Sequence, residues 1–352
     1  KIIKNAFYIA RTGKPGVVVV DLPKDIQRAY GSDCYPTENS VHGYKPDISV
    51  SIGQIDRALE LLNKAQRPIF LAGGGIKIAH AQKEMTELAE LTHVPVITTI
   101  MGKGAIPTTN QLYIGNIGIH GSYAANSAIS HCDVLFSIGA RFNDRITGNT
   151  EEFAPEATII HIDIDAAAIS RTVAADVPIV ADAKQAIDIL RKKARPLHLS
   201  NWLSQINSWK EKHPLAMKNI GLTPQMIIQS INKIFTNAVI VTDVGQNQLW
   251  TTQFIALDEQ KQMLTSGGLG TMGYGFPAAI GAKIGNQQKD VIVVSGDGGI
   301  QMNIQEMATA VAYELPIILC ILNNGYLGNV RQWQEMFYDK RYSSTCMRYR
   351  RS

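Results

Sequence analysis

The sequence predicts an α/β protein with two open parallel-sheet domains, each with helices on both faces. Strand-like apolar runs alternate with helical patterns from Ile52 to about Arg195, and the same alternation restarts at Thr223. Such alternation requires crossover connections, which favour parallel sheets covered on both sides. We therefore expect the tail end of a preceding domain at 1–30, a linker at 31–51, a middle domain at 52–195, a connection at 196–222 and a second domain at 223–352.

The composition is that of a globular protein without nucleic-acid or membrane partners. The 352 residues are 45% hydrophobic and 18% charged, with a formal net charge of +4. A basic cluster suited to nucleic acid is missing before the last few residues, and we expect neither a membrane-spanning segment nor a signal peptide. Cys34, Cys132, Cys320 and Cys346 form no CxxC pair, which argues against disulfides or zinc and fits a reducing, cytoplasmic location.

The first part of the chain is expected to hold a helix and a buried strand. Residues 1–11 follow an amphipathic helix pattern, and "VVVV" at 17–20 is typical of a parallel-sheet strand ended by Pro23. Polar turn formers follow at 28–47. Because the helix pattern begins at the first residue and the last residues lack periodicity, we expect a fragment of a longer protein.

In the middle domain, helices are expected at 52–65, 80–93 and 121–132, and strands at 67–75, 94–100, 133–141 and 157–165, with a last strand and helix over 177–194. The connection is expected to be partly helical. The second domain is expected to have helices at 223–235, 275–285 and 304–315, and strands at 238–245, 290–298 and 316–324. Thr223 is the predicted N-cap of the first of these helices, with Pro224 in its first turn.

Polar residues follow two strands of the second domain. Asp297 follows "VIVV", and Asn323 and Asn324 follow "IILCIL". Ligands of open α/β sheets bind at the carboxyl ends of strands, and carboxylate and amide oxygens suit Mg²⁺. The flanking glycines leave room for a diphosphate: Gly296, Gly298 and Gly299. The alternative is a helix N-cap at Asp297 and a turn at Asn324, but residues 299–322 provide the one helix and one strand that a βαβ unit needs.

This pairing of "GDG" and "NN" resembles the fingerprint of thiamine diphosphate enzymes. The resemblance implies that Asp297, Asn324 and the backbone carbonyl of Tyr326 hold the Mg²⁺ that anchors the cofactor's diphosphate. "LTSGGLGTMGYGFPAAIGA", "VTDVGQNQLW", "ILNNGYLGNVRQWQEMFYDKRYS" and "GARFNDRITG" further resemble the large catalytic subunits of acetolactate (acetohydroxyacid) synthases. That family's fold is a Rossmann-like, flavin-binding middle domain and a thiamine diphosphate-binding C-terminal domain. The resemblance covers nearly the whole chain.

The resemblance implies decarboxylation of pyruvate on thiamine diphosphate, followed by condensation of the two-carbon unit with pyruvate or 2-ketobutyrate. This is the first common step of branched-chain amino-acid biosynthesis. The cofactor would be surrounded by residues that match the family's: Val244, Gly245, Gln246, Asn247, Gly270, Met272, Gly296, Gly298, Gly299, Leu327, Gly328 and Asn329.

Three of the implied roles compete with simpler explanations. Met272 would hold the cofactor bent, although it could instead be core filler. Trp333 would favour 2-ketobutyrate as acceptor, although its spacing from Val330 and Phe337 also fits an apolar helix face. Arg145 would bind the acceptor carboxylate, although it could be a surface residue paired with Asp144.

The resemblance also implies a structural FAD in the middle domain, although the glycines could instead serve strand–helix packing. The implied contacts are Gly73, Gly74, Ile100, Met101, Gly118, His120, Gly121, Gly139, Arg141, Phe142, Asn143, Asp163, Ile164 and Asp182. The chain departs from the family where Asn247 replaces His, Asn329 replaces Met, Asn143 replaces Asp and Lys14 replaces Arg. These departures bear on substrate preference and flavin affinity.

The family's proton relay starts from a glutamate on an N-terminal domain, and this chain has no residue that we can match to it. We expect no catalytic side chain here, an active site between the subunits of a homodimer or a dimer of dimers, a small regulatory subunit, and an inactive fragment. The alternatives are a flavin-carrying relative such as glyoxylate carboligase or pyruvate oxidase, a dehydrogenase with nicotinamide at Gly73–Gly75, and a non-catalytic module that only dimerises.

Overall fold

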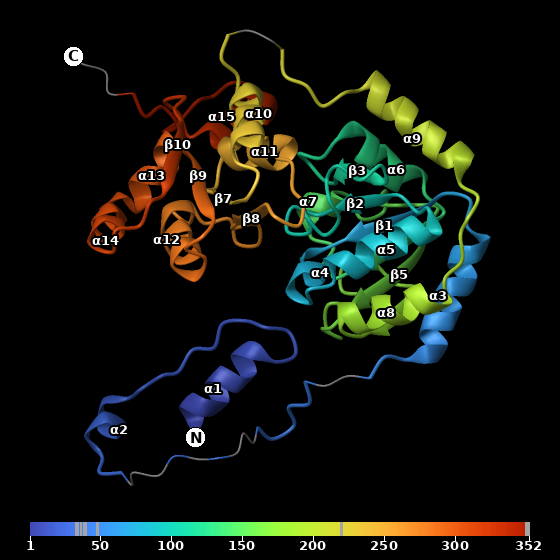
Figure 1. Ribbon diagram of the computed structural model, residues 1–352, viewed down its shortest axis with the longest axis horizontal. Helices are drawn as coiled ribbons and strands as arrows, with labels where there is room; N and C mark the ends of the chain where they lie inside the picture. Colours follow the sequence, from blue (N-terminus) through green and yellow to red (C-terminus); the bar gives the residue numbers. More distant parts are fainter. Residues whose placement is uncertain (32–34, 36, 38–40, 47–48, 219–220, 349–352) are drawn as a thin grey trace.

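Two parallel sheets lie side by side in the computed structural model, which describes residues 1–31, 35, 37, 41–46, 49–218 and 221–348 (Figure 1). The first is a 6-stranded sheet in the order β3-β2-β1-β4-β5-β6, and the second is a 4-stranded sheet in the order β10-β9-β7-β8. Every strand pair in both sheets is parallel. The predicted fold class is therefore confirmed. Cys34 lies outside the described residues.

The middle sheet has the strand order of a dinucleotide-binding fold. Its strands are β1 (Pro68–Ala72), β2 (Val96–Thr98), β3 (Tyr113–Asn116), β4 (Val134–Ile138), β5 (Thr158–Asp163) and β6 (Val177–Val180). The chain order reverses between β1 and β4, whose residues are all buried. Ligands of such sheets bind where the order reverses, at the carboxyl ends of the strands.

Helices cover both faces of this sheet: α3 (Ile52–Lys64), α4 (Gly74–Ile78), α5 (Gln82–Thr92), α6 (Tyr123–His131), α7 (Asp144–Thr147), α8 (Ala183–Lys193) and α9 (Ser200–Lys212). α5 packs on α8 and α6 packs on α9. α9 belongs to the connection expected at 196–222. It adheres to the middle domain through buried Trp202, whose Nε1 donates to the Pro68 carbonyl at 3.1 Å.

The C-terminal sheet separates two hydrophobic cores. Its strands are β7 (Ala238–Thr242), β8 (Gln262–Thr265), β9 (Asp290–Gly296) and β10 (Ile318–Leu322). Ile240, Ile292 and Val294 face one core with α10 (Pro224–Ile234), and Val239, Val241 and Val293 face the other with α12 (Gly275–Gly285). The remaining helices are α11 (Gln246–Phe254), α13 (Asp297–Met302), η1 (Ile304–Glu306), α14 (Met307–Ala312) and α15 (Gly328–Phe337). Thr223 caps α10 by accepting from the Met226 amide, as predicted.

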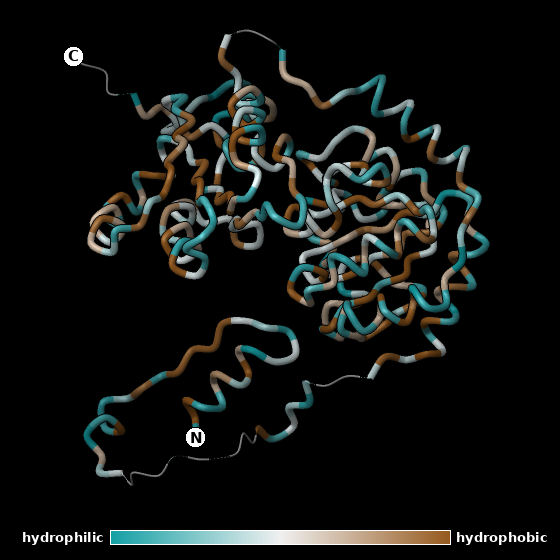
Figure 2. The backbone as a smooth tube through the Cα atoms, in the orientation of Figure 1, coloured by the Kyte–Doolittle hydropathy of each residue, from teal (hydrophilic) through white to brown (hydrophobic). Residues whose placement is uncertain are grey.

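The strand expected at 17–20 is wrong. These residues are extended but pair with no strand, and Val17 and Val19 are 95% and 86% exposed. Figure 2 shows this hydrophobic run lying away from both sheets. α1 (Ile2–Arg11) and α2 (Lys24–Arg28) bury no residue either. Apolarity alone does not make a strand, because a strand needs a neighbour for its backbone hydrogen bonds.

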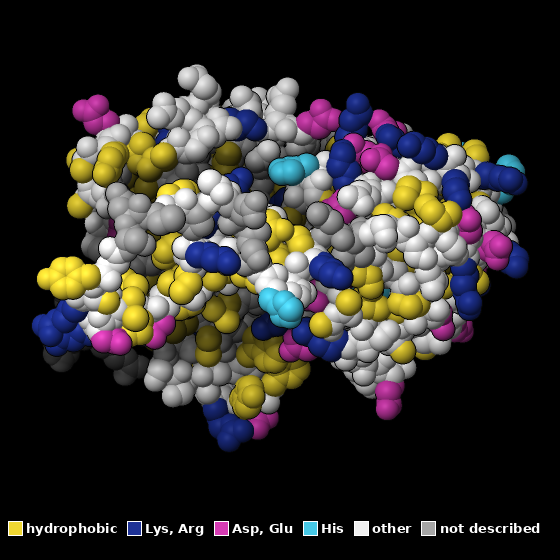
Figure 3. Space-filling view, turned by 90° about the horizontal axis from the view of Figure 1, so that it is seen from below, with side chains coloured by type: hydrophobic (Ala, Val, Ile, Leu, Met, Phe, Trp, Pro, Cys, Tyr) yellow, Lys and Arg dark blue, Asp and Glu magenta, His cyan; other side chains and the backbone are white. Residues whose placement is uncertain are grey.

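Hydrophobic side chains are also visible across the face of the molecule on the side of this N-terminal segment (Figure 3). Among the described residues, no helix is both long and apolar enough to cross a membrane.

Lys103 is a buried cation in the middle domain. It is 2% exposed, and its Nζ lies 5.7 Å from the ring centroid of Tyr113. Burial lowers the pKa of Lys103 to about 7, because the ammonium loses its hydration shell. An unfolded lysine has a pKa of about 10.4. The unfolded state therefore binds more protons above pH 7, so this group makes stability rise with pH from about 7 to about 10.

We predict that Lys103→Met stabilises the protein at pH 7, by on the order of 5 °C in Tm, because it removes a desolvated cation while keeping the apolar stem. The gain should shrink as pH rises past about 10.4, where the wild-type lysine becomes neutral in the unfolded state as well. Calorimetry at pH 7 and at higher pH measures both effects. Lys192→Met, at an exposed position of α8, is the control. A variant that melts below the wild type at pH 7 would contradict the prediction.

Candidate functional site

The predicted metal ligands meet at one edge of the C-terminal sheet. β9 and β10 are adjacent, with Gly296 opposite Leu322 at their carboxyl ends. Asp297 therefore begins α13 directly beside the loop that Asn323 and Asn324 open. The Gly325 amide donates to Asp297 Oδ2 at 3.1 Å, which joins the two halves of the motif. The expected placement of both motifs at one edge is confirmed.

A chain of side-chain amides orders the Asn324 loop. Asn324 Nδ2 donates to Gln246 Oε1 at 3.2 Å, and Gln246 Nε2 donates to Gln332 Oε1 at 3.2 Å. Asn324 Oδ1 accepts from the Tyr326 amide at 2.9 Å. The described part of the chain contains no group of three or more His, Cys, Asp or Glu side chains that could hold a metal ion. One carboxylate, one amide oxygen and one carbonyl form a donor set of hard oxygens, which fits Mg²⁺ better than Zn²⁺.

Apolar side chains from three loops converge on Gly298 in the first turn of α13. A Cβ at this glycine would lie 3.0 Å from Leu327 Cδ2 and from Met347 Sδ, and 3.5 Å from Met272 Cε. Gly298 and Gly299 are buried. The structure thus brings Met272 and Leu327 beside the Asp297 motif, where the missing side chain of Gly298 leaves room for them to pack against the backbone. Met347 is a neighbour that the sequence did not indicate.

The Asp243 carboxylate ties the surrounding loops together. It is 1% exposed and follows β7 directly. It accepts hydrogen bonds from the amides of Val244 at 2.7 Å, Gly273 at 3.0 Å and Gly275 at 2.9 Å. The sequence contained one clue to this role: an acidic residue at the end of an apolar strand. That pattern does not indicate the role, because the Gly273 and Gly275 amides lie about thirty residues away in the chain.

The side-chain amide nitrogen of Asn247 is hydrogen-bonded within the fold. It is 4% exposed, and its Nδ2 donates to the carbonyls of Asp243 at 2.8 Å and Val294 at 3.0 Å. Gly245, with φ of +143°, precedes α11 as its N-cap. A diphosphate at this helix terminus would therefore meet backbone amides of residues 245–247 and not the Asn247 side-chain amide.

A cavity of about 900 Å³ lies between the two sheet domains and the loop around Lys14, which follows α1. It opens at the switch point of the middle sheet. Many of the expected flavin contacts line it: Gly74, Ile100, Met101, His120, Gly139, Arg141, Asn143, Asp163, Ile164 and Asp182. Val244, Gly270, Asn329, Arg145 and Trp333 line the same cavity. Residues predicted for three different ligands thus share one continuous space.

The other expected flavin contacts shape the walls of this cavity without lining it. A Cβ at Gly73 would overlap the Gly139 carbonyl, and one at Gly118 would overlap the Arg145 carbonyl. At Gly121 the nearest atom would be the Asn116 carbonyl oxygen, at 2.5 Å. These glycines allow backbone segments to cross closely. Phe142 is 1% exposed and packs against His161 and Phe153 in the core.

The polar groups of the cavity suit a large anionic ligand. Only two carboxylates line it, those of Asp163 and Asp182. Five cationic side chains line it as well: Arg11, Lys14, Lys77, Arg141 and Arg145. Burial lowers the pKa of Lys77. Four lining residues each have a buried polar atom without a protein partner: Asn116 Nδ2, Asn143 Oδ1, Thr252 Oγ1 and Asn329 Oδ1. Buried polar atoms are rarely left unpaired, so these fit a ligand or water in the cavity, and the volume admits a dinucleotide.

Arg145 and Trp333 line the cavity with their side chains partly exposed. Arg145 Nη1 donates to Asp144 Oδ1 at 3.0 Å, which is the surface pairing considered as the alternative to substrate binding. Trp333 is 43% exposed on α15, with its ring 5.1 Å from that of Phe337. Arg145 thus makes the surface pairing with Asp144, and Trp333 packs on Phe337 as on an apolar helix face. Both residues nevertheless line the cavity.

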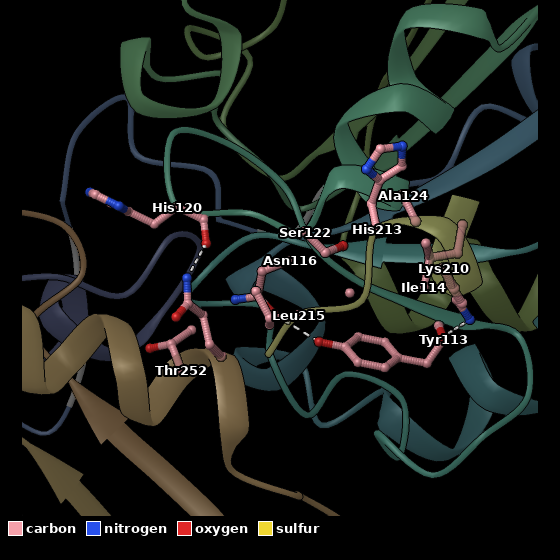
Figure 4. A pocket seen from close by; sticks show the side chains of 12 residues that line it. Tyr113, Ile114, Asn116, His120, Ser122, Ala124, Lys210, His213, Leu215 and Thr252 are labelled. Carbon is pink, nitrogen blue, oxygen red and sulfur yellow. Dashed lines mark hydrogen bonds between the residues drawn. The ribbon is translucent and has the colours of Figure 1, made fainter. Parts of the chain in front are cut away.

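A smaller cavity of about 160 Å³ lies beside the large one and shares Asn116, His120 and Thr252 with it (Figure 4). Gln253 Nε2 donates to the His120 carbonyl at 3.1 Å across the domain junction. Tyr113 donates its hydroxyl to Asn116 Oδ1 at 2.8 Å. The bond from Gln253 holds α11 against the loop that follows β3, and the bond from Tyr113 orients the Asn116 side chain within β3.

Comparisons with known families match both sheet domains. The model described as "Thiamine pyrophosphate enzyme, central domain" matches residues 55–190, and the model described as "Thiamine pyrophosphate enzyme, C-terminal TPP binding domain" matches residues 243–350. The first match spans the six-stranded sheet, and the second spans the loops around Asp243, Asp297 and Asn324.

Individual relatives are similar over nearly the whole chain. The acetolactate synthase large subunit of Buchnera aphidicola subsp. Schizaphis graminum is 43% identical over 355 residues, covering 98% of this chain and 62% of the relative. The probable acetolactate synthase large subunit of Methanocaldococcus jannaschii is 44% identical over 356 residues, covering 97% and 60%. The acetolactate synthase isozyme 3 large subunit of Escherichia coli K12 is 41% identical over 359 residues, covering 99% and 62%. The chain thus spans about three fifths of the length of these relatives.

We predict that Gly73→Ala damages the switch point of the middle sheet. The added Cβ meets backbone atoms of Gly139 and Ala140, which cannot rotate away, so a loss of about 3 kcal/mol in unfolding free energy is expected. Thermal melting measures it. Gly281→Ala in α12, where a Cβ meets nothing within 4 Å, is the control and should not destabilise. Equal Tm values for Gly73→Ala and the wild type would contradict this role.

We predict that Asp243→Ala destabilises the C-terminal domain by about 3 kcal/mol, because three amides lose their acceptor. Asp290→Ala removes an exposed carboxylate at the start of β9 and serves as the control. Calorimetry compares the two variants. Amide hydrogen exchange at 270–275 should also rise in Asp243→Ala alone, and unchanged exchange there would show that the carboxylate does not hold this loop.

Proposed function

The chain belongs to the thiamine pyrophosphate enzyme family, and from that membership we propose that the protein acts as an acetolactate synthase. The proposal rests on two observations: the Asp297 and Asn324 motifs meet at one edge of the C-terminal sheet, and Val244, Gly270 and Asn329 from its neighbouring loops line the same cavity as Arg145 and Trp333. Identities of 41–44% to acetolactate synthase large subunits over nearly the whole chain support it. The substrates would be pyruvate and, as an alternative acceptor, 2-ketobutyrate.

The proposed Mg²⁺ site consists of Asp297, Asn324 and the Tyr326 carbonyl. Phosphate oxygens and water would complete the six positions that Mg²⁺ requires. Backbone amides at 245–247 and 298–299 would meet the diphosphate. Gln246 is held by Asn324 and Gln332, so the metal loop, α11 and α15 would respond together to the cofactor.

When bound, thiamine diphosphate supplies a carbanion that adds to a 2-keto acid and accepts the electron pair left by departing CO₂. The protein's residues would orient the reactants. Met272 would press on the cofactor from the loop that Asp243 holds. Arg145 would exchange its exposed partner Asp144 for the acceptor carboxylate, to which a guanidinium can bind in bidentate fashion. Trp333 would limit the space for the acceptor's alkyl group.

The balanced reaction needs no oxidant. Two pyruvate ions and one proton give one 2-acetolactate ion and one CO₂; with 2-ketobutyrate as acceptor, the product is 2-aceto-2-hydroxybutyrate. A flavin would therefore be structural. We propose that FAD occupies the large cavity, with its phosphates near the cationic residues and its hydroxyls near Asp163. Lys14 lines this cavity while its Nζ lies 2.6 Å from Asp165 Oδ2, so its charge is already paired.

The proposed assembly is a cytoplasmic homodimer, or a dimer of dimers, with a smaller regulatory subunit. The printed names of the relatives describe large subunits, which supports a partner of smaller size. We assign no acid–base glutamate within this chain, which spans about three fifths of the length of its relatives. The chain of 352 residues is therefore expected to bind cofactors without turning over pyruvate.

The test is product analysis with the protein expressed from its complete gene, with thiamine diphosphate, Mg²⁺ and FAD. Pyruvate should give acetolactate, and pyruvate with 2-ketobutyrate should shift the product to acetohydroxybutyrate. Trp333→Leu should lower this acceptor preference about tenfold, because the indole no longer shapes the acceptor pocket. Phe337→Leu, on the same helix but outside the cavity lining, is the control.

Other products would redirect the proposal. Acetyl phosphate from pyruvate would indicate a pyruvate oxidase, and tartronate semialdehyde from glyoxylate would indicate a glyoxylate carboligase. An unchanged acceptor preference in Trp333→Leu would leave the reaction in place and remove Trp333 from the specificity site.

A further inference from the structure

Residues 343–348, which we call the return segment, fold back over the metal-binding loop. The Leu327 amide donates to the Thr345 carbonyl at 2.8 Å, and the Met347 amide donates to the Gly325 carbonyl at 2.9 Å. Tyr326 and Cys346 form an antiparallel bridge between these bonds. The return segment therefore lies alongside residues 325–327 as a short second strand.

Gln334 of α15 fastens the return segment. Its Nε2 donates to the Ser343 carbonyl at 3.0 Å, and its Oε1 accepts from the Thr345 hydroxyl at 3.3 Å. Thr345 is 2% exposed, although its neighbours in the chain are exposed. The same helix carries Gln332, which contacts Gln246, so α15 reaches the metal loop from two sides.

Guanidinium groups stack on the Tyr326 side chain. The Arg331 Cζ lies 4.4 Å from the Tyr326 ring centroid and 3.9 Å from that of Tyr342. The Arg348 Cζ lies 5.4 Å from the Tyr326 centroid. Such contacts contribute from about 0.5 to about 2 kcal/mol each, depending on exposure. Arg331 thus joins α15, the metal loop and Tyr342, which directly precedes the return segment.

These contacts fix the direction of one carbonyl. The Tyr326 carbonyl and the Leu327 amide belong to the same trans peptide plane, in which C=O and N–H point in opposite directions. Because the Leu327 N–H points at Thr345, the Tyr326 C=O points away from the return segment. The preceding peptide plane is fixed as well, since its N–H donates to Asn324 Oδ1 and its Gly325 carbonyl accepts from Met347.

We propose that Arg331, through its stack on Tyr326 and Tyr342, is a positioning residue for the divalent metal. It holds the loop and the return segment in the arrangement that aims the Tyr326 carbonyl at the metal. This inference rests on the proposed function, which makes that carbonyl a ligand. The side chain of Arg331 is not one of the proposed metal ligands and does not line the large cavity.

The positive charge of Arg331 allows an experiment to separate a positioning role from a purely electrostatic one. Arg331 is a cation near a site for a divalent cation, so its removal should strengthen metal binding if charge alone matters. The positioning role predicts the opposite, because a carbonyl that can rotate binds an ion less well. A loss of metal affinity in Arg331→Met therefore cannot result from the lost charge.

The experiment measures Mn²⁺ binding to the 352-residue chain with saturating thiamine diphosphate, by counting free Mn²⁺ with electron paramagnetic resonance. Arg331→Met should weaken the Kd about tenfold, and Arg331→Lys, which keeps a cation, should recover part of the loss. Tyr342→Leu removes the second ring from the stack and should also weaken binding, without altering the motif. Arg341→Met, which removes an exposed arginine whose side chain contacts Asp339 and the Tyr338 carbonyl, should bind as the wild type does.

Amide hydrogen exchange without metal gives an independent readout. Exchange at Leu327 and Met347 should be faster in Arg331→Met than in the wild type and Arg341→Met. Unchanged Mn²⁺ affinity in Arg331→Met, or an equal loss in Arg341→Met, would overturn the positioning role while leaving the proposed function intact. A wild-type chain that binds no Mn²⁺ with thiamine diphosphate would overturn the proposed cofactor site and this inference with it.

Discussion

The buried carboxylate of Asp243 is the constraint on which the C-terminal site depends. A carboxylate that is 1% exposed must have its oxygens bonded, and three backbone amides do this. Two of those amides belong to the loop between β8 and α12, which carries Met272. The carboxylate also lies against Gly299, where a Cβ would come within 2.7 Å of Oδ1. Through one side chain, the end of β7 thus sets the distance between the Met272 loop and the Asp297 motif.

The fold was predictable where local pattern and sheet burial agree. The fully buried strands β1, β4 and β7 and the buried stretch 291–295 of β9 are mainly apolar, and each strand was expected from the sequence. β3 and β8 were not expected, because each is a short edge strand that is only partly buried. The expectation of a strand at 17–20 was wrong for the opposite reason. This segment has the apolar pattern, but no neighbouring strand pairs with it in the described residues.

The site was predictable in its motifs but not in its connections. Asp297 and Asn324 could be placed together because the sequence predicts β9 and β10 as strands of one βαβ unit. The connection is helical as expected, but it is divided into α13, η1 and α14 instead of one helix at 304–315. The partners of Asp243, the bond from Asn324 to Gln246 and the return of Thr345 onto Leu327 join segments from about eighteen to seventy-eight residues apart. No short-range pattern encodes such contacts. The shared cavity was equally hidden, because its lining comes from both domains and from residues 11–15.

Asn247 illustrates how one substitution can change what a site residue does. At the position where acetolactate synthases usually have histidine, this chain has asparagine, whose side-chain nitrogen carries two hydrogens. Both are used, on the carbonyls of Asp243 and Val294 at the ends of adjacent strands β7 and β9. One imidazole nitrogen carries at most one hydrogen, so a histidine could not make both bonds from one atom. The amide therefore braces the sheet edge beneath the proposed diphosphate site, and the charge of that diphosphate would be met by backbone amides and the metal.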